Sequence, residues 1–141
     1  MFKILMRCAV VAVVVLAGCG GGGSTKADVN AITLSDFKIA AGATTFKPGS
    51  YTFTIKNNGP NQHELLVFST DLESSAFPTD SSGDMQEDGA GVTKVSDGDN
   101  IDSGKSQTRT VDLTTPGTYV FVCNLPGHFK AGMVTKITVA P

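Results

Sequence analysis

The stretch GTYVFVCNLPGHFKAGMVTKITVA, residues 117–140, decides the fold. Its first part alternates along the chain and places three side chains on one face of an extended strand: Tyr119, Phe121 and Cys123. A loop with turn residues such as Pro126 and Gly127 follows, and alternation resumes in MVTKITVA, residues 133–140. Two strands joined by such a loop predict β-structure at this end of the chain.

Further alternating segments precede this pair. They are AITLSDFKI (31–39), SYTFTIKNNG (50–59), HELLVF (63–68) and SQTRTVDL (106–113), and turn residues separate them. No stretch shows a convincing helical period. Several short strands in a domain of about 110 residues predict an all-β fold, an antiparallel sandwich or barrel.

One segment breaks the pattern. Residues 71–102 contain nine acidic residues and a single basic one, Lys94. We expect a long acidic surface excursion here, with one short strand near residues 92–95, and it could face a basic partner. The piece DGDNID, residues 97–102, suggests a calcium loop but lacks the glycine at the sixth position and the glutamate at the twelfth. A solvated loop is therefore the default interpretation.

The N-terminus has the pattern of an export signal. Lys3 and Arg7 precede an apolar run, residues 9–18, which is too short to span a bilayer and suits a signal peptide. The run ends in LAGC, and this resembles the bacterial lipoprotein signal, in which Cys19 is lipidated after cleavage. The alternative is an ordinary secretory signal, with Cys19 an incidental residue.

The predicted organisation has three parts. Residues 1–18 are the signal peptide, residues 19–28 are the lipidated cysteine and a glycine-rich linker, and residues 29–141 are the folded domain. A flexible linker of this length reaches roughly 15–18 Å. The domain is thus expected to be lipid-anchored to a bacterial membrane and to face the periplasm or the cell exterior.

Cysteine usage limits the chemistry of the domain. Cys8 leaves with the signal peptide and Cys19 is expected to be lipidated, so Cys123 is the one cysteine of the folded domain. A disulfide within the domain is therefore excluded. An unpaired thiol in an oxidising compartment is either buried and inert or bound to something.

The neighbours of Cys123 favour a metal. His128 and Met133 follow in the same loop, and the other histidine of the chain, His63, begins a predicted strand. Two imidazoles, a thiolate and a thioether are the donors of a blue-copper site, in which the methionine is a weak axial ligand. Zinc also binds cysteine and histidine but rarely methionine, so copper is favoured.

From about residue 31 onward the chain resembles a cupredoxin, the family of plastocyanin, azurin and rusticyanin. The resemblance is carried by NNGPNQHELLVF (57–68) and PGTYVFVCNLPGHFKAGMVTKITV (116–139). The Cys-x4-His-x4-Met spacing is most similar to that of rusticyanin and sulfocyanin. The resemblance implies a Greek-key sandwich of about seven or eight strands with one type 1 copper at one end, bound by His63, Cys123, His128 and Met133.

The chain departs from the family pattern in two places. Many cupredoxins have an asparagine directly after the first histidine ligand, where it bridges two ligand loops, whereas this chain has Glu64. The acidic segment between His63 and Cys123 has no counterpart in the smallest members. The first departure affects the surroundings of the metal and its reduction potential, and the second leaves the shape of the acidic segment open.

The resemblance also implies how the protein acts. The ring edge of His128 is expected at the surface as an electron port, surrounded by Leu125, Pro126 and Phe129; alternatively, Leu125 and Phe129 pack down onto the loop. The expected function is that of a membrane-tethered electron carrier with transient redox protein partners near His128. The alternative is copper storage or delivery.

Other classes of function are not expected. Four donors leave no open coordination position, which disfavours an enzyme and a small-molecule substrate. A formal net charge of −2 and the lack of a basic stripe disfavour nucleic acid as a partner.

Overall fold

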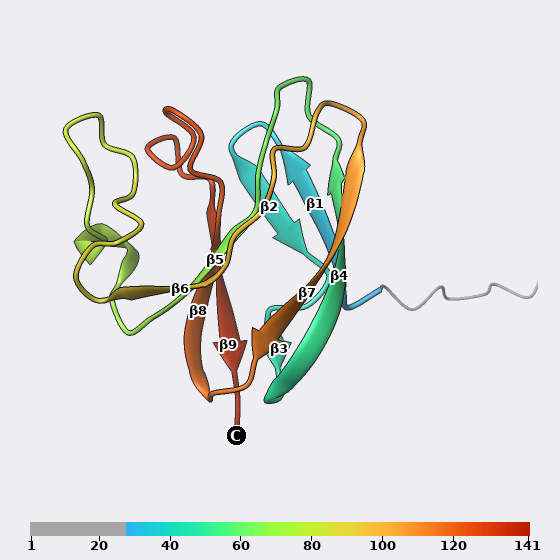
Figure 1. Ribbon diagram of the computed structural model, residues 1–141, viewed down its shortest axis with the longest axis vertical. Coiled ribbons are helices and arrows are strands. Elements are labelled where there is room, and N and C mark those ends of the chain that lie inside the picture. Colours follow the sequence, from blue (N-terminus) through green and yellow to red (C-terminus); the bar gives the residue numbers. More distant parts are fainter. Residues whose placement is uncertain (1–27) are drawn as a thin grey trace, which may run out of the picture.

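The computed structural model describes residues 28–141 as two β-sheets (Figure 1). The predicted signal peptide and Cys19 lie outside the described residues. Within that range no helix is long and apolar enough to cross a membrane. The elements follow in the order β1 (Ala31–Ser35), β2 (Lys38–Ala41), β3 (Thr45–Phe46), β4 (Gly49–Asn57), β5 (Leu66–Thr70), η1 (Ser74–Ala76), β6 (Val92–Ser96), β7 (Ser106–Leu113), β8 (Gly117–Val122) and β9 (Val134–Val139).

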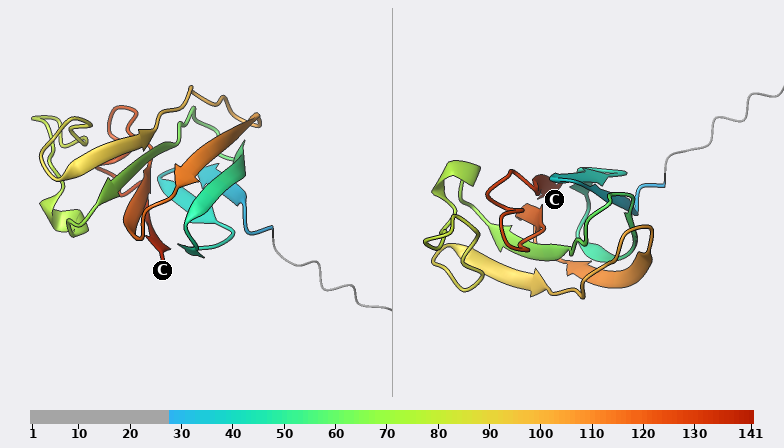
Figure 2. Two further views of the ribbon diagram at one scale, coloured as in Figure 1. Left: turned by 60° about the horizontal axis from the view of Figure 1, so that its bottom comes forward. Right: turned by 90° about the horizontal axis from the view of Figure 1, so that it is seen from above.

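The strands form one four-stranded and one five-stranded sheet. Their orders are β2-β1-β4-β7 and β3-β9-β8-β5-β6, and Figure 2 shows the two layers from other sides. Most neighbouring strands are antiparallel, whereas β1–β4 and β3–β9 are parallel pairs, so both sheets are mixed. The predicted all-β sandwich is confirmed, and this part of the chain has nine strands.

Inward-facing side chains of both sheets form the main core. The period of two places alternate residues of each strand on the inner face. In β4, for example, Phe53 and Ile55 are fully buried, whereas Thr54 between them is exposed. The same core contains Leu65, Val67, Phe121, Cys123, Met133 and Ile137 from the second sheet and its ends.

The N-terminal segment differs from the prediction. Residues 31–39 were expected to form one strand, but β1 and β2 are an antiparallel hairpin with a two-residue turn, Asp36 and Phe37. The burial pattern explains why: Leu34 and Ile39 both face the core, and an odd spacing cannot place two residues on one face of a single strand.

The segment with the first histidine also differs. A strand was expected from residue 63, but β5 begins at Leu66, and His63 forms an isolated antiparallel bridge with Ile101. Strand β5 is buried on both faces. Val67 faces the main core, while Leu66 and Phe68 belong to a second apolar cluster on the outer face of the sheet.

The acidic excursion covers that second cluster. It projects to one side of the sandwich in Figure 1 and contributes Phe77 and Met85, both buried, to the cluster around β5 and β8. It also contains the predicted short strand, β6, which pairs with β5. The excursion therefore supplies apolar cover for one sheet face, although many of its charged residues are exposed.

Candidate metal centre

Three predicted ligands, from two distant segments of the chain, meet at one end of the sandwich. His63 Nδ1 lies 3.2 Å from His128 Nδ1 and 3.8 Å from Cys123 Sγ, and His128 Nδ1 lies 3.3 Å from the same sulfur. In Figure 1 this is the upper end, where the β8–β9 loop and the segment before β5 lie. His63 and Cys123 are fully buried and His128 is half-buried. Three such donors within 4.8 Å of one another can bind one metal ion together.

Strands β8 and β9 position the two sulfur-bearing residues. Cys123 follows the last residue of β8 and Met133 precedes the first of β9. The N–H of Cys123 donates to the carbonyl of Met133 at 3.1 Å, so the two residues lie opposite one another as an extension of the β8–β9 ladder. Both side chains are fully buried in the main core.

The loop between these strands turns tightly around His128. Its N–H donates to the carbonyl of Leu125 at 2.8 Å, and its own carbonyl accepts from the N–H of Met133 at 3.0 Å. Gly127 and Gly132 have φ values of 83° and 94°, in the left-handed region that glycine adopts without strain. The sequence Pro-Gly-His and the later glycine therefore return the chain to β9 with His128 facing the other donors.

Backbone hydrogen bonds hold His63 on the side of the site opposite the β8–β9 loop. Its N–H and carbonyl exchange hydrogen bonds with Ile101 at 3.1 and 2.6 Å. The fully buried Asn57 donates from its amide to the carbonyls of Asn61 and Ile101, both at 2.8 Å. The segment that carries His63 is thus tied to residues 97–102, the piece that resembled a calcium loop.

Burial sets the protonation state of the buried donors. It lowers the pKa of His63, against the opposing effect of the hydrogen bond that the ring makes to the carboxylate of Asp36, and so favours the neutral imidazole that a metal requires. Burial also raises the pKa of the Cys123 thiol, an effect that a backbone N–H from Glu64 partly offsets. Without metal the thiol is therefore protonated at neutral pH.

Glu64 bridges the two ligand segments. Its backbone N–H lies 3.4 Å from Cys123 Sγ, and its carboxylate Oε1 accepts a hydrogen bond from the N–H of Asn124 at 3.1 Å. Burial raises the pKa of Glu64, and the bond from Asn124 opposes that shift. The bridge that the resemblance assigned to asparagine is thus made by a carboxyl group.

The acidic excursion binds the ligand loop directly. The buried Asp84 accepts hydrogen bonds from the N–H groups of Gly127 at 2.7 Å and Lys130 at 3.4 Å, on either side of His128. The side chain of Asn124 exchanges two hydrogen bonds with the backbone of Met85, both at 2.9 Å. The excursion therefore holds the loop as well as covering the sheet.

The residues predicted around His128 lie at different depths. Pro126 is exposed, whereas Leu125 packs against the main core and Phe129 against the second cluster, where its ring lies 6.1 Å from Phe77. The exposed Phe37 lies edge-on to His128, with ring centroids 5.4 Å apart.

Sequence reasoning did not single out the partners that surround the ligands. They are Asp36, Phe37, Asp84, Ile101 and Asn124. The odd spacing of Leu34 and Ile39 signals the turn that carries two of them. No local pattern marks the other three, because their contacts join residues about 40 positions apart.

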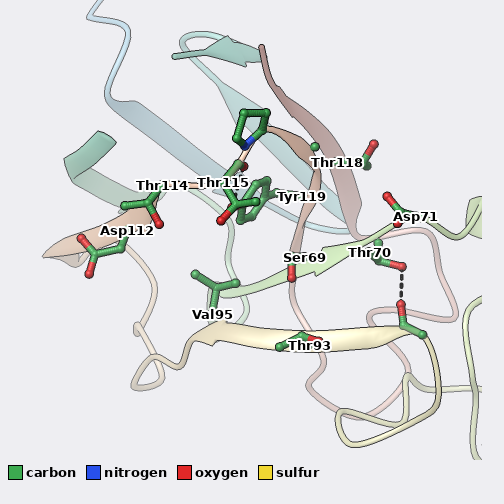
Figure 3. Close-up of a pocket in the computed structure, with 13 residues that line it drawn as sticks. Ser69, Thr70, Asp71, Thr93, Val95, Asp112, Thr114, Thr115, Thr118 and Tyr119 are labelled. Atoms are coloured by element: carbon green, nitrogen blue, oxygen red, sulfur yellow. Dashed lines mark hydrogen bonds between the residues drawn. The ribbon is translucent and has the colours of Figure 1, made fainter. Parts of the chain in front are cut away.

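One surface pocket lies away from the donors. It has a volume of about 500 Å³ and is lined mainly by hydroxyl-bearing and acidic side chains near the start of β8 and the end of β5 (Figure 3). The donors lie past the other end of β8, about 20 Å along the strand. The pocket is therefore not part of this centre.

A two-sheet sandwich with a buried cysteine and two histidines at one end defines a copper protein of the type 1 class. The chain belongs to the plastocyanin/azurin family of copper-binding proteins, whose pattern matches residues 28–140. Copper is accordingly its cofactor. The donors fit this ion because a thiolate favours Cu(I) and imidazole serves both oxidation states.

Individual relatives agree with this assignment. The chain is 33% identical over 88 residues to the copper-resistant cuproprotein CopI of Rubrivivax gelatinosus, covering 62% of this chain and 50% of CopI. It is also 33% identical over 125 residues to barley (Hordeum vulgare) chloroplastic plastocyanin, covering 89% and 61% of the two chains. The chain thus spans between half and two thirds of the length of these relatives.

A solved structure confirms the fold. Reduced auracyanin from Roseiflexus castenholzii superposes with a TM-score of 0.57 at 24% identity, over 79% of this chain and 95% of auracyanin. This likeness supports the cupredoxin sandwich.

Proposed function

We propose that this protein is a membrane-tethered, extracytoplasmic electron carrier with one type 1 copper ion. The residues that would hold the ion are His63, Cys123, His128 and Met133, the last as the weak fourth donor. The observation that carries the proposal is the convergence of His63 Nδ1, His128 Nδ1 and Cys123 Sγ within 4.8 Å of one another at the buried end of the sandwich. Copper, when bound, supplies a one-electron couple between Cu(I) and Cu(II).

The chain holds its ligands in a nearly fixed arrangement. Backbone hydrogen bonds join His63 to Ile101 and Cys123 to Met133. The loop around His128 is held by a hydrogen bond to the carboxylate of Asp84. Because each ligand segment is held by hydrogen bonds, a change of oxidation state requires little movement of the protein. Such a preorganised and mostly buried donor set suits an electron carrier better than a site that must exchange its ion.

We propose that redox protein partners dock transiently near His128. The half-buried ring of His128, the exposed Pro126 and the exposed Phe37 support this location. Small encounter interfaces of redox proteins bury less than about 1,200 Å². The proposal includes no catalytic step, no small-molecule substrate and no nucleic acid.

The location outside the cytoplasm rests on the sequence of the N-terminus. The LAGC motif at Cys19 and the following glycines support a lipid anchor on a bacterial membrane and a short linker. The likeness to auracyanin, described as a protein of a photosynthetic bacterium, is compatible with a bacterial carrier.

Copper storage or delivery is the second candidate. The observation that favours it is the similarity to CopI, a protein named as a copper-resistant cuproprotein. In that case the protein releases Cu(I) to an acceptor instead of retaining it through redox cycles.

Redox cycling distinguishes the two candidates. The full chain, loaded with one Cu(II), is reduced and reoxidised repeatedly in the presence of a Cu(I) chelator of moderate affinity. An electron carrier keeps its copper and regains its visible absorption in each cycle. Transfer of copper to the chelator upon the first reduction contradicts electron carriage and supports delivery. Cys123→Ser, which removes the thiolate, is the control for loss of the site.

A further inference from the structure

The turn between β1 and β2 contacts both histidine ligands. Asp36 Oδ1 lies 3.3 Å from His63 Nε2, and the ring of Phe37 lies edge-on to that of His128 at 5.4 Å. Phe37 has a φ of 58°, in the left-handed region that a residue with a large side chain rarely adopts. Left-handed backbone at a non-glycine residue costs about 1–2 kcal/mol and persists where surrounding contacts hold it.

Neighbouring residues enclose the contact between Asp36 and His63. The amide of Asn61 donates to the second carboxylate oxygen of Asp36 at 2.9 Å. Gly59 approaches so closely that a Cβ on it would lie 2.9 Å from Asp36 Oδ1 and 3.0 Å from His63 Nε2. His63 is fully buried and the side chain of Asp36 is 33% exposed, so the carboxylate joins the buried imidazole to the surface.

The two nitrogens of His63 therefore have different partners. Nδ1 faces Cys123 and His128, whereas Nε2 faces a carboxylate that can only accept a hydrogen bond when ionised. In a neutral imidazole one nitrogen carries the proton and the other has the free lone pair. The contact with Asp36 selects the tautomer with the proton on Nε2 and leaves Nδ1 free.

We propose that Asp36 is a positioning residue of the copper site, acting through His63. Its carboxylate fixes the ring orientation and the tautomer of His63 and makes the imidazole a stronger donor. The inference rests on the ligand set of the proposed function, but it requires copper binding only and not electron transfer. Carboxylates hydrogen-bonded to ligand imidazoles typically change metal affinity 10–100-fold when they are removed.

The negative charge of Asp36 stabilises the more highly charged ion. We therefore expect Asp36→Asn to weaken Cu(II) binding by about tenfold or more and Cu(I) binding less. Each tenfold difference between the two oxidation states raises the reduction potential by about 59 mV, since one electron is transferred. Asparagine can still accept from Nε2, so this variant tests the charge with the hydrogen bond retained.

Asp102→Asn is the matched control. Asp102 is exposed, accepts a hydrogen bond from the side chain of Gln62 at 2.8 Å, and is not bonded to His63. The substitution removes the same charge close to the same ligand segment. Because an exposed charge is screened by solvent and salt, we expect it to change the Cu(II) affinity by less than about threefold.

Nuclear magnetic resonance of the metal-free chain tests the contact without copper. The 15N shifts of His63 are expected to show a single tautomer, with the proton on Nε2, and Asp36→Ala is expected to produce a mixture. Gly59→Ala, which adds a Cβ where Asp36 and His63 meet, is a second variant and is expected to act in the same direction.

The experiment measures the tautomer of His63, its Nδ1 shift upon addition of diamagnetic Cu(I), and the reduction potentials of the full-length wild type and variants. A higher potential in Asp36→Asn than in Asp102→Asn, with a mixed tautomer in Asp36→Ala, supports the inference. Equal potentials in the two asparagine variants, or an unchanged tautomer, overturn it. If His63 Nδ1 does not shift with Cu(I), the ligand set is itself wrong and the inference falls with it.

Discussion

The N–H of Asn124, the residue after Cys123, donates to the carboxylate of Glu64, the residue after His63, at 3.1 Å. This hydrogen bond joins the segment before β5 to the residues that follow β8. Because each partner is next to a ligand in the chain, the bond limits how far the two ligands can move apart. The carboxyl of Glu64 is half-buried, and burial raises its pKa.

Removing the acceptor of this bond should destabilise the metal-free protein. Glu64→Ala leaves the N–H of Asn124 without its partner, at a cost of about 1–3 kcal/mol in the free energy of unfolding. Glu64→Gln keeps an oxygen in place and should cost clearly less. Urea unfolding of both variants measures the difference, and equal losses of stability would show that the hydrogen bond has no role.

The excursion should limit opening of the ligand loop. Asp84→Ala removes the side-chain acceptor for the N–H groups of Gly127 and Lys130. We expect faster hydrogen exchange of these two amides and a decrease of about 1–3 kcal/mol in the free energy of unfolding. Asp88→Ala, at an exposed position of the same excursion, is the control and should leave both exchange rates unchanged. Exchange as slow in Asp84→Ala as in the control would contradict the proposed role of the excursion.

Copper binding should release the proton of Cys123. Because burial raises the pKa of the thiol, it is protonated in the metal-free chain at neutral pH, whereas the metal binds the thiolate. The Cu(I) affinity should therefore rise about tenfold for each pH unit until the thiol ionises. Chelator competition between pH 7 and 9 measures the slope. An affinity independent of pH in this range would mean that the thiolate already exists without metal.

Phe37 should slow the escape of copper. Phe37→Gly removes the ring beside His128 and also relieves the strained backbone at φ 58°. Loss of the ring contact destabilises the fold, whereas relief of the backbone strain stabilises it by about 1–2 kcal/mol. Because the two effects oppose one another, we expect little change in the free energy of unfolding. Extraction of copper by a chelator should become several-fold faster.

Val29→Gly provides the comparison for Phe37. Val29 is the other exposed large apolar residue of the described chain, at 53% exposure, and lies before β1, at the opposite end of that strand from the turn. Removal of the Val29 side chain should leave the rate of copper extraction unchanged. The same rate in both variants would rule out a protective role for Phe37.

Local pattern was sufficient to predict strands β7 and β8. Alternation predicted β7 at residues 106–113 without error and placed Phe121 and Cys123 on one face, because a period of two is a property of the backbone itself. It failed at the start of β5, where the predicted start at residue 63 was wrong. His63 and Leu65 are buried like the strand that follows, but His63 forms an isolated bridge with Ile101, and this long-range pairing leaves no trace in the local pattern.

The surroundings of the metal could not be predicted in the same way. Spacing and donor chemistry indicated Cys123, His128 and His63, whose donor atoms the structure brings together. Asp84 and its hydrogen-bond partner Gly127 are 43 residues apart in the sequence, and only the folding of the excursion brings them together. Such contacts depend on how loops pack, which no periodic pattern encodes.

The visible absorption spectrum of the full chain loaded with one equivalent of Cu(II) tests the central claim most directly. Direct bonding of the Cys123 thiolate to Cu(II) predicts an intense charge-transfer band, which reductant bleaches, oxidant restores and Cys123→Ser abolishes. A pale spectrum with only weak bands, or one that Cys123→Ser leaves intact, would contradict a type 1 copper site at these residues.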